Sequence, residues 1–472
     1  MTEAQPEADT VEQRTQVIGR ELLERSTAAA PSVLQAGWWE DQMLQWAMRD
    51  DRLRTQLFRF VDVLPSLQSG REVAAHLLEY LLVPGVDLPA PLAQALRFST
   101  PGSLGGRLAA LAARQNVRRL GRRFIAGETP EEAIACVTAL RQRKMAFTLD
   151  ALGEAVTSDA QADAYADTYF NLIESLCRSA LHWAPVSPID DAGVPRVNVS
   201  LKLTALDPHF DAIAPHRSKD VVLRRLRPIL RLARQRNAFV NVDMEEFRHK
   251  DLTLEIFKTV FMDDELRDFE HVGIVVQAYL TASEHDLSAL IEWARKRACP
   301  ITVRLVKGAY WEHEVAFAAQ HGWPTPVFTE KWETDLAFER LTAQLMRHAA
   351  TVRPAVASHN VRSLAKALAL AESHRLAPGD FEIQMLYGMG DSLKQAIVER
   401  GLSLRVYAPF GPLIPGMGYL IRRLLENTSN DSFLRQSFQE NVPLEILLAL
   451  PAPAPERDSP SSSSPAEGGR TP

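Results

Sequence analysis

Polar and charged side chains recur at the points where short apolar runs of this 472-residue sequence end. The pattern occurs in VNVSLKLTAL, VNVDMEEF, IVVQAY, ITVRLVKGAYW, VASHN and LRVYAP. For any single residue, a charge at the rim of a sheet explains the pattern as well as a functional role does. If the runs are parallel strands of one barrel, their carboxyl ends meet at one end of it, and several such residues together there indicate a site. The candidates are Lys202, Asp243, Gln277, Arg304, Lys307, His359 and Tyr407.

A second group of charges lies in the helical segment MGYLIRRLLEN. Arg422 and Glu426 are four residues apart and share a helix face, so an ion pair is the simplest interpretation of those two. Arg423 points elsewhere. Two adjacent guanidinium groups also suit a small carboxylate, because the planar fork of an arginine bonds both carboxylate oxygens.

Several sequence motifs of common enzyme classes are absent. The chain has no GxGxxG after a strand, no GxxxxGK[ST], no CxxC pair and no GxSxG. His313 and Glu314 lack the second histidine of an HExxH site. The sequence therefore disfavours a Rossmann dehydrogenase, a P-loop enzyme, a zinc protease and a serine hydrolase, and it predicts no metal site.

The elements that must position these residues form a regular alternation after residue 145. Helical patterns such as KDVVLRRLRPILRLARQR separate eight β-rich runs, and they are long enough to return the chain to a parallel neighbour. Eight such units predict a closed (β/α)8 TIM barrel, with an open doubly wound sheet as the alternative. The runs are 147–150, 197–203, 239–244, 273–279, 301–307, 355–358, 381–385 and 404–407.

The region before the barrel is predicted to be helical. From about residue 15 to 142, apolar residues recur at spacings of three and four. The aromatic residues Trp38, Trp39, Trp46, Phe58 and Phe60 share that spacing, which favours buried packing over an exposed binding surface. The Pro/Ser-rich end has almost nothing to bury and is predicted to be disordered. The expected domains are 1–140 (helical arm and α-domain), 141–449 (barrel) and 450–472 (tail).

Composition narrows the partners and the compartment. The net charge of -6 comes from 53 basic and 59 acidic residues without a long run of one sign, which disfavours a nucleic-acid partner. The three cysteines are far apart and fit a reducing cytoplasm. The polar start lacks the apolar core of a signal peptide, and no apolar stretch reaches the roughly 18 residues of a spanning helix. We therefore expect a cytoplasmic protein whose membrane contact, if it has one, is peripheral.

The strand-end segments closely resemble the proline dehydrogenase domain of the bacterial proline utilisation A flavoenzymes. The match runs from about Phe147 to Phe438, with VRLVKGAYW, ASHN, FEIQMLYGMG and YAPFG, followed by YLIRRLLEN, in the order of the family. The segment GWWEDQMLQWAMRD resembles the arm and helical domain that precede the family's barrel. The resemblance implies a distorted β/α barrel that binds FAD and oxidises L-proline to Δ1-pyrroline-5-carboxylate by hydride transfer. This is the first step of proline catabolism to glutamate, with a membrane quinone as electron acceptor.

The resemblance also implies residue roles. Lys202, Arg422 and Arg423 would hold the substrate carboxylate, with Tyr310 and Tyr407 against the proline ring and Leu386 in the pocket wall. Arg304, near flavin N5, would act in catalysis with Lys202 and Asp243, and Glu154 in TLDALGEA would be a lid carboxylate that pairs with an active-site arginine. The implied flavin contacts are Asp243, Gln277, Arg304, Val306, Thr329, Lys331, His359 and Glu426.

These roles agree with the chemistry of proline oxidation. The protein must hold the ring carbon beside the amine against the flavin, and clustered cations fix the carboxylate and disfavour a protonated amine. Arg304 can stabilise negative charge that develops on the reduced flavin.

Two other interpretations remain open at this point. Lys202 or Lys307 could form a Schiff base, as in barrel aldolases. The chain could also be a helical interaction module with an inactive barrel, although the nearly complete set of site residues disfavours this.

The start lacks an evident DNA-binding segment, and the chain stops where an aldehyde dehydrogenase domain would begin, so neither repressor activity nor glutamate formation is expected. The sequence leaves open which quinone is used, and whether the chain forms a homo-oligomer.

Overall fold

The computed structural model describes residues 4–29, 51–86, 88, 90–152, 156–412 and 443–453. Eight strands form a closed barrel in the order β1 to β8, and every neighbouring pair is parallel. The barrel closes where Ala146 of β1 pairs with Arg405 of β8. All eight predicted runs contribute strands, so the predicted β/α barrel is confirmed and the open sheet is wrong. The strands are β1 (Ala146–Ala151), β2 (Asn198–Leu201), β3 (Phe239–Val242), β4 (Val272–Gln277), β5 (Ile301–Val306), β6 (Val352–Ala357), β7 (Glu382–Leu386) and β8 (Leu404–Phe410).

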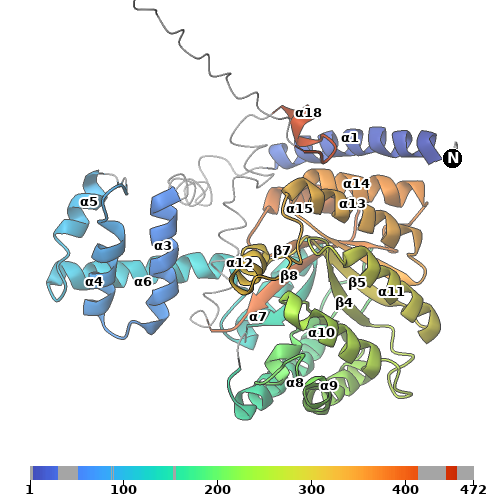
Figure 1. The fold of residues 1–472 in the computed structure, drawn as a ribbon, viewed down its shortest axis with the longest axis horizontal. Helices are drawn as coiled ribbons and strands as arrows, with labels where there is room; N and C mark the ends of the chain where they lie inside the picture. The colour runs from blue at the N-terminus through green and yellow to red at the C-terminus, as the bar shows by residue number, and fades with distance from the viewer. Residues whose placement is uncertain are drawn as a thin grey trace, which may run out of the picture.

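Helices surround this barrel because each of them has one apolar face (Figure 1). In α9 the side chains of Val222, Leu226 and Ala233 are buried, and the helix ends at Asn237, whose left-handed backbone (φ 52°) stops the helical turn. Two helices, α12 and α13, follow β5. The helices between strands are α8 (Asp159–Ala180), α9 (Pro215–Arg236), α10 (Phe247–Val260), α11 (Ser283–Arg297), α12 (Trp311–His321), α13 (Lys331–Arg347), α14 (Val361–Ser373) and α15 (Asp391–Glu399), with the short 3-10 helix η2 (Leu203–Leu206) after β2.

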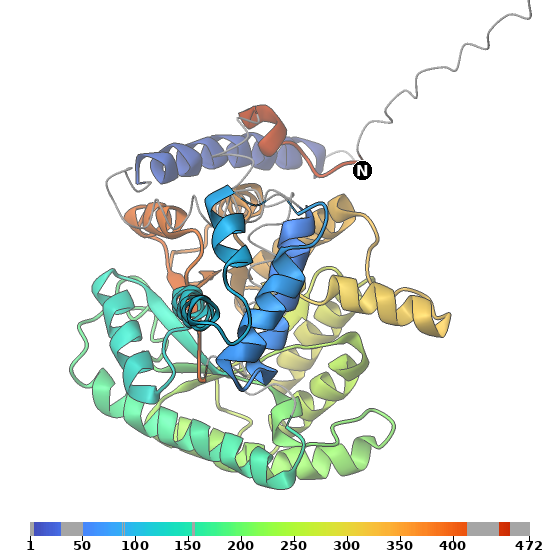
Figure 2. The ribbon, with the colours of Figure 1, turned by 90° about the vertical axis from the view of Figure 1, so that its left-hand side faces the viewer.

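The N-terminal helices stand beside the barrel with a core of their own (Figures 1 and 2). Phe60 is buried in that core, as its spacing predicted, while Trp38, Trp39, Trp46 and the side chain of Phe58 lie outside the described residues. A capping box between Ser69 and Glu72 starts α4. The elements are α3 (Asp51–Val63), the 3-10 helix η1 (Leu64–Ser66), α4 (Gly70–Leu81), α5 (Ala90–Arg97) and α6 (Leu104–Phe124), followed by α7 (Pro130–Gln142), which packs on β1.

The end of α6 joins this helical region to the barrel through a close backbone contact. Gly388, after β7, has φ +76°, and a Cβ atom there would lie 2.0 Å from the backbone oxygen of Arg123. Only glycine fits both the backbone angle and the gap. Two backbone hydrogen bonds continue the contact, from Ala126 to Pro409 and from Gly411 to Gly127.

Helix α1 (Ala4–Ala28) does not join the other N-terminal helices. It lies across α14 and α15, beside the short helix α18 (Leu444–Leu447) (Figures 1 and 2). Gly19 makes this packing close, because a Cβ there would lie 2.5 Å from the side chain of Leu448. In the part of the chain that the structure describes, no helix is long and apolar enough to cross a membrane.

Candidate active site

Four of the predicted site residues sit at or near the carboxyl ends of neighbouring barrel strands. Lys202 directly follows β2, Asp243 directly follows β3 and Gln277 is the last residue of β4. Arg304 lies within β5, two residues before its end. All four side chains are buried. Because the strands are parallel, these residues converge on one end of the barrel, as the sequence predicted.

The carboxylate of Asp243 is the hub of a buried hydrogen-bond network. Its Oδ1 accepts from Arg304 Nη1 at 2.7 Å, and its Oδ2 accepts from the hydroxyl of Tyr407 at 2.7 Å. The ammonium of Lys202 lies 3.9 Å from the same Oδ2. The guanidinium of Arg304 stands 5.2 Å from the centre of the Tyr407 ring and also donates to Ser200 Oγ at 3.0 Å. One carboxylate therefore orients a cation with one of its oxygens and a phenol with the other.

Asp150 on β1 is a site residue that the sequence analysis missed. Lys202 Nζ donates to both of its carboxylate oxygens at 2.7 Å, and its side chain is fully buried. Burial raises the pKa of Asp150 to about 6, with Asp243 adding to the shift and Lys202 opposing it. A signal was available, because Asp150 ends the apolar run FTLD just as Asp243 follows VNV.

The network contains two cations, Lys202 and Arg304, and two carboxylates, Asp150 and Asp243. Each cation is bonded to a carboxylate in a buried setting, where removing one partner leaves an uncompensated charge that costs about 3 to 5 kcal/mol. The four side chains therefore fix one another's positions. The two cations are ordered, and their charge is balanced by the two carboxylates.

A second set of predicted residues lies next to this network. Gln277 pairs in register with Val306 of β5 and donates from Nε2 to the backbone oxygen of Glu245 at 3.0 Å. Among the residues that the structure describes, the Oε1 atom of Gln277 and the Nε atom of Arg304 are buried without a hydrogen-bond partner. A buried acceptor and a buried donor of this kind can be satisfied by water or by a polar ligand.

On the other side of the barrel, Leu386 ends β7 and pairs in register with Tyr407 of β8. The backbone N–H of Leu386 donates to Nε2 of His359 at 3.0 Å, which places the ring proton on Nδ1. The structure therefore brings Leu386, Tyr407 and His359 to one stretch of the mouth. Tyr407 is the fourth residue of β8, which continues to Phe410, so it lies within the strand and not after it.

The remaining described candidates lie at the starts of α12 and α13. Lys331 donates to Asp335 at 2.7 Å, and Asp335 also pairs with Lys307, which directly follows β5. Lys307 keeps its contact although burial lowers the pKa of its ammonium. Thr329 is exposed just before this helix, and Tyr310 is half-buried at the N-cap of α12.

Four predicted residues fall outside the described part of the chain: Arg422, Arg423 and Glu426, and the lid residue Glu154. Their roles stay predictions. Within the described ranges, no group of three histidine, cysteine or acidic side chains is placed to hold a metal ion.

A closed parallel β/α barrel with buried ion pairs at its carboxyl mouth has the architecture of barrel enzymes. Comparison with known proteins identifies the family. The proline dehydrogenase family profile matches residues 133–436, and the profile of the proline utilization A N-terminal domain matches residues 12–124. The chain therefore belongs to the proline dehydrogenase family and carries the N-terminal domain of the proline utilization A proteins ahead of its barrel. The resemblance inferred from the sequence is confirmed.

Individual relatives agree with this assignment. The chain is 32% identical over 326 residues to the proline dehydrogenase of Deinococcus radiodurans, which covers 69% of this chain and 91% of that protein. It is 31% identical over 352 residues to the bifunctional protein PutA of Klebsiella aerogenes, which covers 72% of this chain and 26% of that protein. The crystal structure of proline utilization A from Bdellovibrio bacteriovorus, inactivated by N-propargylglycine, superposes with a TM-score of 0.85 at 41% identity, over 94% of this chain and 44% of that one. The chain thus spans about a quarter of the first curated relatives it matches.

Proposed function

We propose that this chain oxidises L-proline to Δ1-pyrroline-5-carboxylate with FAD as the hydride acceptor, as the first step of proline catabolism. The observation that carries the proposal is the buried network of Asp150, Lys202, Asp243, Arg304 and Tyr407 at the mouth of a barrel of the proline dehydrogenase family. The chain's coverage of 91% of the Deinococcus radiodurans proline dehydrogenase supports the assignment of this activity to the barrel.

The described residues fit a flavin. A flavin ring carries one imide N–H donor between two carbonyl acceptors, and the buried Oε1 of Gln277 needs a donor while the buried Nε of Arg304 needs an acceptor. Lys331 and His359 add a cation and a ring N–H at the same end of the barrel. When bound, the flavin supplies the two-electron acceptor that amino-acid side chains lack.

The chain's own residues would bind and orient the substrate. The ammonium of Lys202, together with Arg422 and Arg423, would hold the proline carboxylate, since charge-assisted contacts to a carboxylate are strong in a buried site. Tyr310, Tyr407 and Leu386 would wall the ring, and Glu154 would close the site as a lid. Arg304, held by Asp243 and Ser200, would present a fixed positive charge where negative charge develops.

The Schiff-base alternative loses its support in the structure. The ammonium of Lys202 is bonded to both oxygens of Asp150, and that of Lys307 to Asp335. A lysine nucleophile needs a free amine that a carbonyl carbon can reach, and these contacts occupy both ammonium groups.

The wider context also remains a proposal. We infer a membrane quinone as the final electron acceptor and a cytoplasmic location with peripheral contact at the membrane. The division at residues 140 and 449 into a helical region, a catalytic barrel and a tail belongs to the same proposal. Its order agrees with the two matched profiles, which occupy 12–124 and 133–436.

The test is to identify the cofactor and the substrate directly. The purified chain, incubated with FAD and freed of excess by gel filtration, should retain a yellow cofactor that co-chromatographs with FAD after denaturation. It should reduce a dye acceptor with L-proline and leave NAD unreduced. A colourless protein that FAD fails to reconstitute, or a flavoprotein that L-proline does not reduce, would overturn the proposal.

A further inference from the structure

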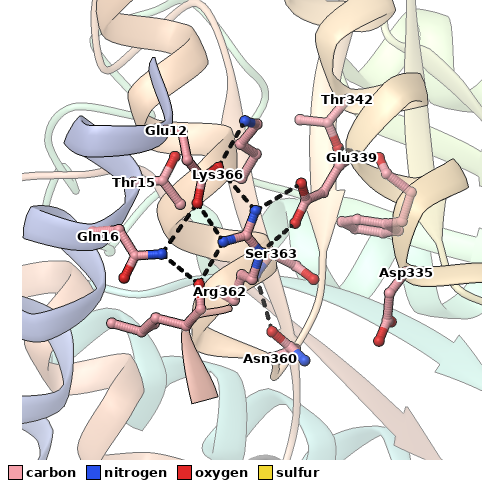
Figure 3. A network of polar contacts seen from close by, with 12 residues as sticks. Glu12, Thr15, Gln16, Asp335, Glu339, Thr342, Asn360, Arg362, Ser363 and Lys366 are labelled. Atoms are coloured by element: carbon pink, nitrogen blue, oxygen red, sulfur yellow. Dashed lines mark hydrogen bonds and ion pairs between the residues drawn. The ribbon is translucent and has the colours of Figure 1, made fainter. Parts of the chain in front are cut away.

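The guanidinium of Arg362, the second residue of α14, contacts three other segments of the chain: α13, α1 and the residue after α18 (Figure 3). Its Nε and Nη2 atoms donate to the two carboxylate oxygens of Glu339 on α13 at 2.8 and 3.1 Å. Its Nη1 and Nη2 atoms donate to Glu12 on α1 at 2.7 and 3.0 Å. Nη1 also donates to the backbone oxygen of Leu448, which follows α18. All five N–H groups of the arginine are therefore used.

Two further side chains donate hydrogen bonds to Glu12. Lys366, one turn farther along α14, donates to Glu12 at 3.3 Å, and Gln16 on α1 donates to Glu12 at 3.1 Å. The group thus holds two cations and two carboxylates. The side chains of Arg362 and Glu339 are only 4% and 6% exposed, so the loss of a partner here leaves a buried charge unmatched.

The helices that Arg362 connects begin with proposed cofactor residues. On α13, Lys331, Asp335 and Glu339 are four residues apart and lie on one face, and Lys331 is bonded to Asp335. On α14, His359 stands three residues before Arg362, next to the N-cap Asn360, and accepts the backbone N–H of Leu386. The contacts of Arg362 therefore fasten the first turn of α14 to the third turn of α13, where Glu339 lies, and so fix the position of α13 relative to the start of α14.

We propose that Glu12, Arg362 and Glu339 form a positioning node through which α1 holds the first turn of α14 and the third turn of α13, and thereby keeps His359 and Lys331, which lie at the starts of these helices, in place for the flavin. The inference rests on the proposed function, because Lys331 and His359 are assigned to the flavin there. The three residues of the node act through others, so they are positioning residues and not catalytic ones.

Helix α1 offers a matched control at Glu21, farther along the helix. Glu21 pairs with Arg400, which follows α15, and Arg14 donates to Glu372 in the last turn of α14 at 3.0 Å. These contacts also fasten α1 to the barrel, but they lie away from the first turns of α13 and α14. Glu12→Gln and Glu21→Gln make the same chemical change on the same helix, and only Glu12→Gln disturbs the node.

The experiment compares both variants with the wild-type full-length chain. Hydrogen–deuterium exchange of the flavin-free protein should accelerate at 331–335 and 359–363 in Glu12→Gln and stay at the wild-type rate there in Glu21→Gln. The dissociation constant for FAD, measured by flavin fluorescence, should rise about tenfold in Glu12→Gln, the size expected for one charge-assisted hydrogen bond, and by less than about twofold in Glu21→Gln. Glu12→Asp, which keeps the charge on a shorter side chain, should restore most of the affinity.

Equal FAD affinity and equal exchange in the two variants would overturn the inference, as would exchange in Glu12→Gln that rises only along α1. If Glu12→Gln loosens the whole chain, Lys366→Met, which removes only the 3.3 Å contact to Glu12, takes its place in the comparison with Glu21→Gln. If the wild-type chain does not bind FAD, the proposed function fails. The exchange data on the flavin-free protein then still show whether Glu12 holds the two first turns.

Discussion

The replacement Asp243→Asn removes the charge at the centre of the network while it preserves the shape of the side chain. The asparagine oxygen can still accept from Arg304, and its NH2 group then faces Tyr407, whose hydroxyl can turn to accept a hydrogen bond. The contact that weakens most is therefore the 2.7 Å bond to Arg304, which changes from ion pair to charge–dipole. In the variant, Tyr407 can therefore keep a hydrogen bond to residue 243, whereas Arg304 loses its ion pair.

A buried hydrogen bond to a charged partner contributes about 1.5 to 3 kcal/mol, so a network that aligns Arg304 in the transition state should lose that much. The efficiency kcat/KM for L-proline should fall roughly 10- to 150-fold. Steady-state kinetics with a dye acceptor, normalised to the flavin content of each preparation, measure the loss. Tyr407→Phe removes the other bond to Asp243 and serves as the partner variant in a double-mutant cycle.

Because both bonds meet on one carboxylate, the two losses should not add in Asp243→Asn/Tyr407→Phe. Full additivity in the double variant would show that the bond between Tyr407 and Asp243 does not contribute to kcat/KM. An Asp243→Asn protein within twofold of wild-type kcat/KM would refute the claim that this carboxylate positions Arg304.

Three more predictions follow from the structure. Gly388→Ala should lower the free energy of unfolding in urea by about 1 to 3 kcal/mol more than Gly401→Ala. Both glycines have a positive φ (+76° and +74°), but only at Gly388 would the added Cβ meet a neighbour, the backbone oxygen of Arg123 at 2.0 Å. Equal losses in the two variants would contradict the steric argument. Burial opposes ionisation of Glu12, yet Arg362, Gln16 and Lys366 together lower its pKa from 4.5 to about 2, so its contribution to stability should be complete above pH 4.5 and be lost as the pH falls toward 2. With solvent screening of this partly exposed group, we expect about 1 to 2 kcal/mol in acid titrations of wild type against Glu12→Gln, and a constant difference between the two from pH 6 to 2 would contradict it. Tyr407→Ser should weaken transition-state stabilisation for L-proline by about 1 to 3 kcal/mol and bring kcat/KM for 4-hydroxyproline closer to that for L-proline. An unchanged ratio of these two kcat/KM values would show that Tyr407 does not form part of the pocket wall.

The barrel could be predicted from the sequence because its strands are buried on both faces. Segments such as 272–277, whose six residues are all buried in the structure, read as apolar runs, and long amphipathic helices separate them. The polar residues that end those runs were predictable for the same reason, since a charge such as Asp243 or Lys202 stands out against apolar neighbours. Lys331 and Thr329 stand in no such run, and only the family resemblance identified them.

The sequence pattern did not reveal contacts between distant segments. The bond between Glu12 and Arg362 joins residues 350 positions apart. The periodicity of α1 predicts a helix but does not show that it packs on α14 and not on the helices that follow it in the sequence. Asp150 was missed, although it follows the same rule as Asp243. The space beside Gly388 likewise depends on where the end of α6 arrives, which is a property of the folded chain.

The most direct test of the account is an anaerobic absorption spectrum of the FAD-loaded chain before and after L-proline is added. The account predicts that the visible flavin band bleaches with L-proline, and that the bleaching slows strongly in Arg304→Met, a variant that should still bind the substrate carboxylate through other residues. A flavin band that L-proline leaves unchanged in the wild-type protein would contradict the central claim that this barrel mouth oxidises proline.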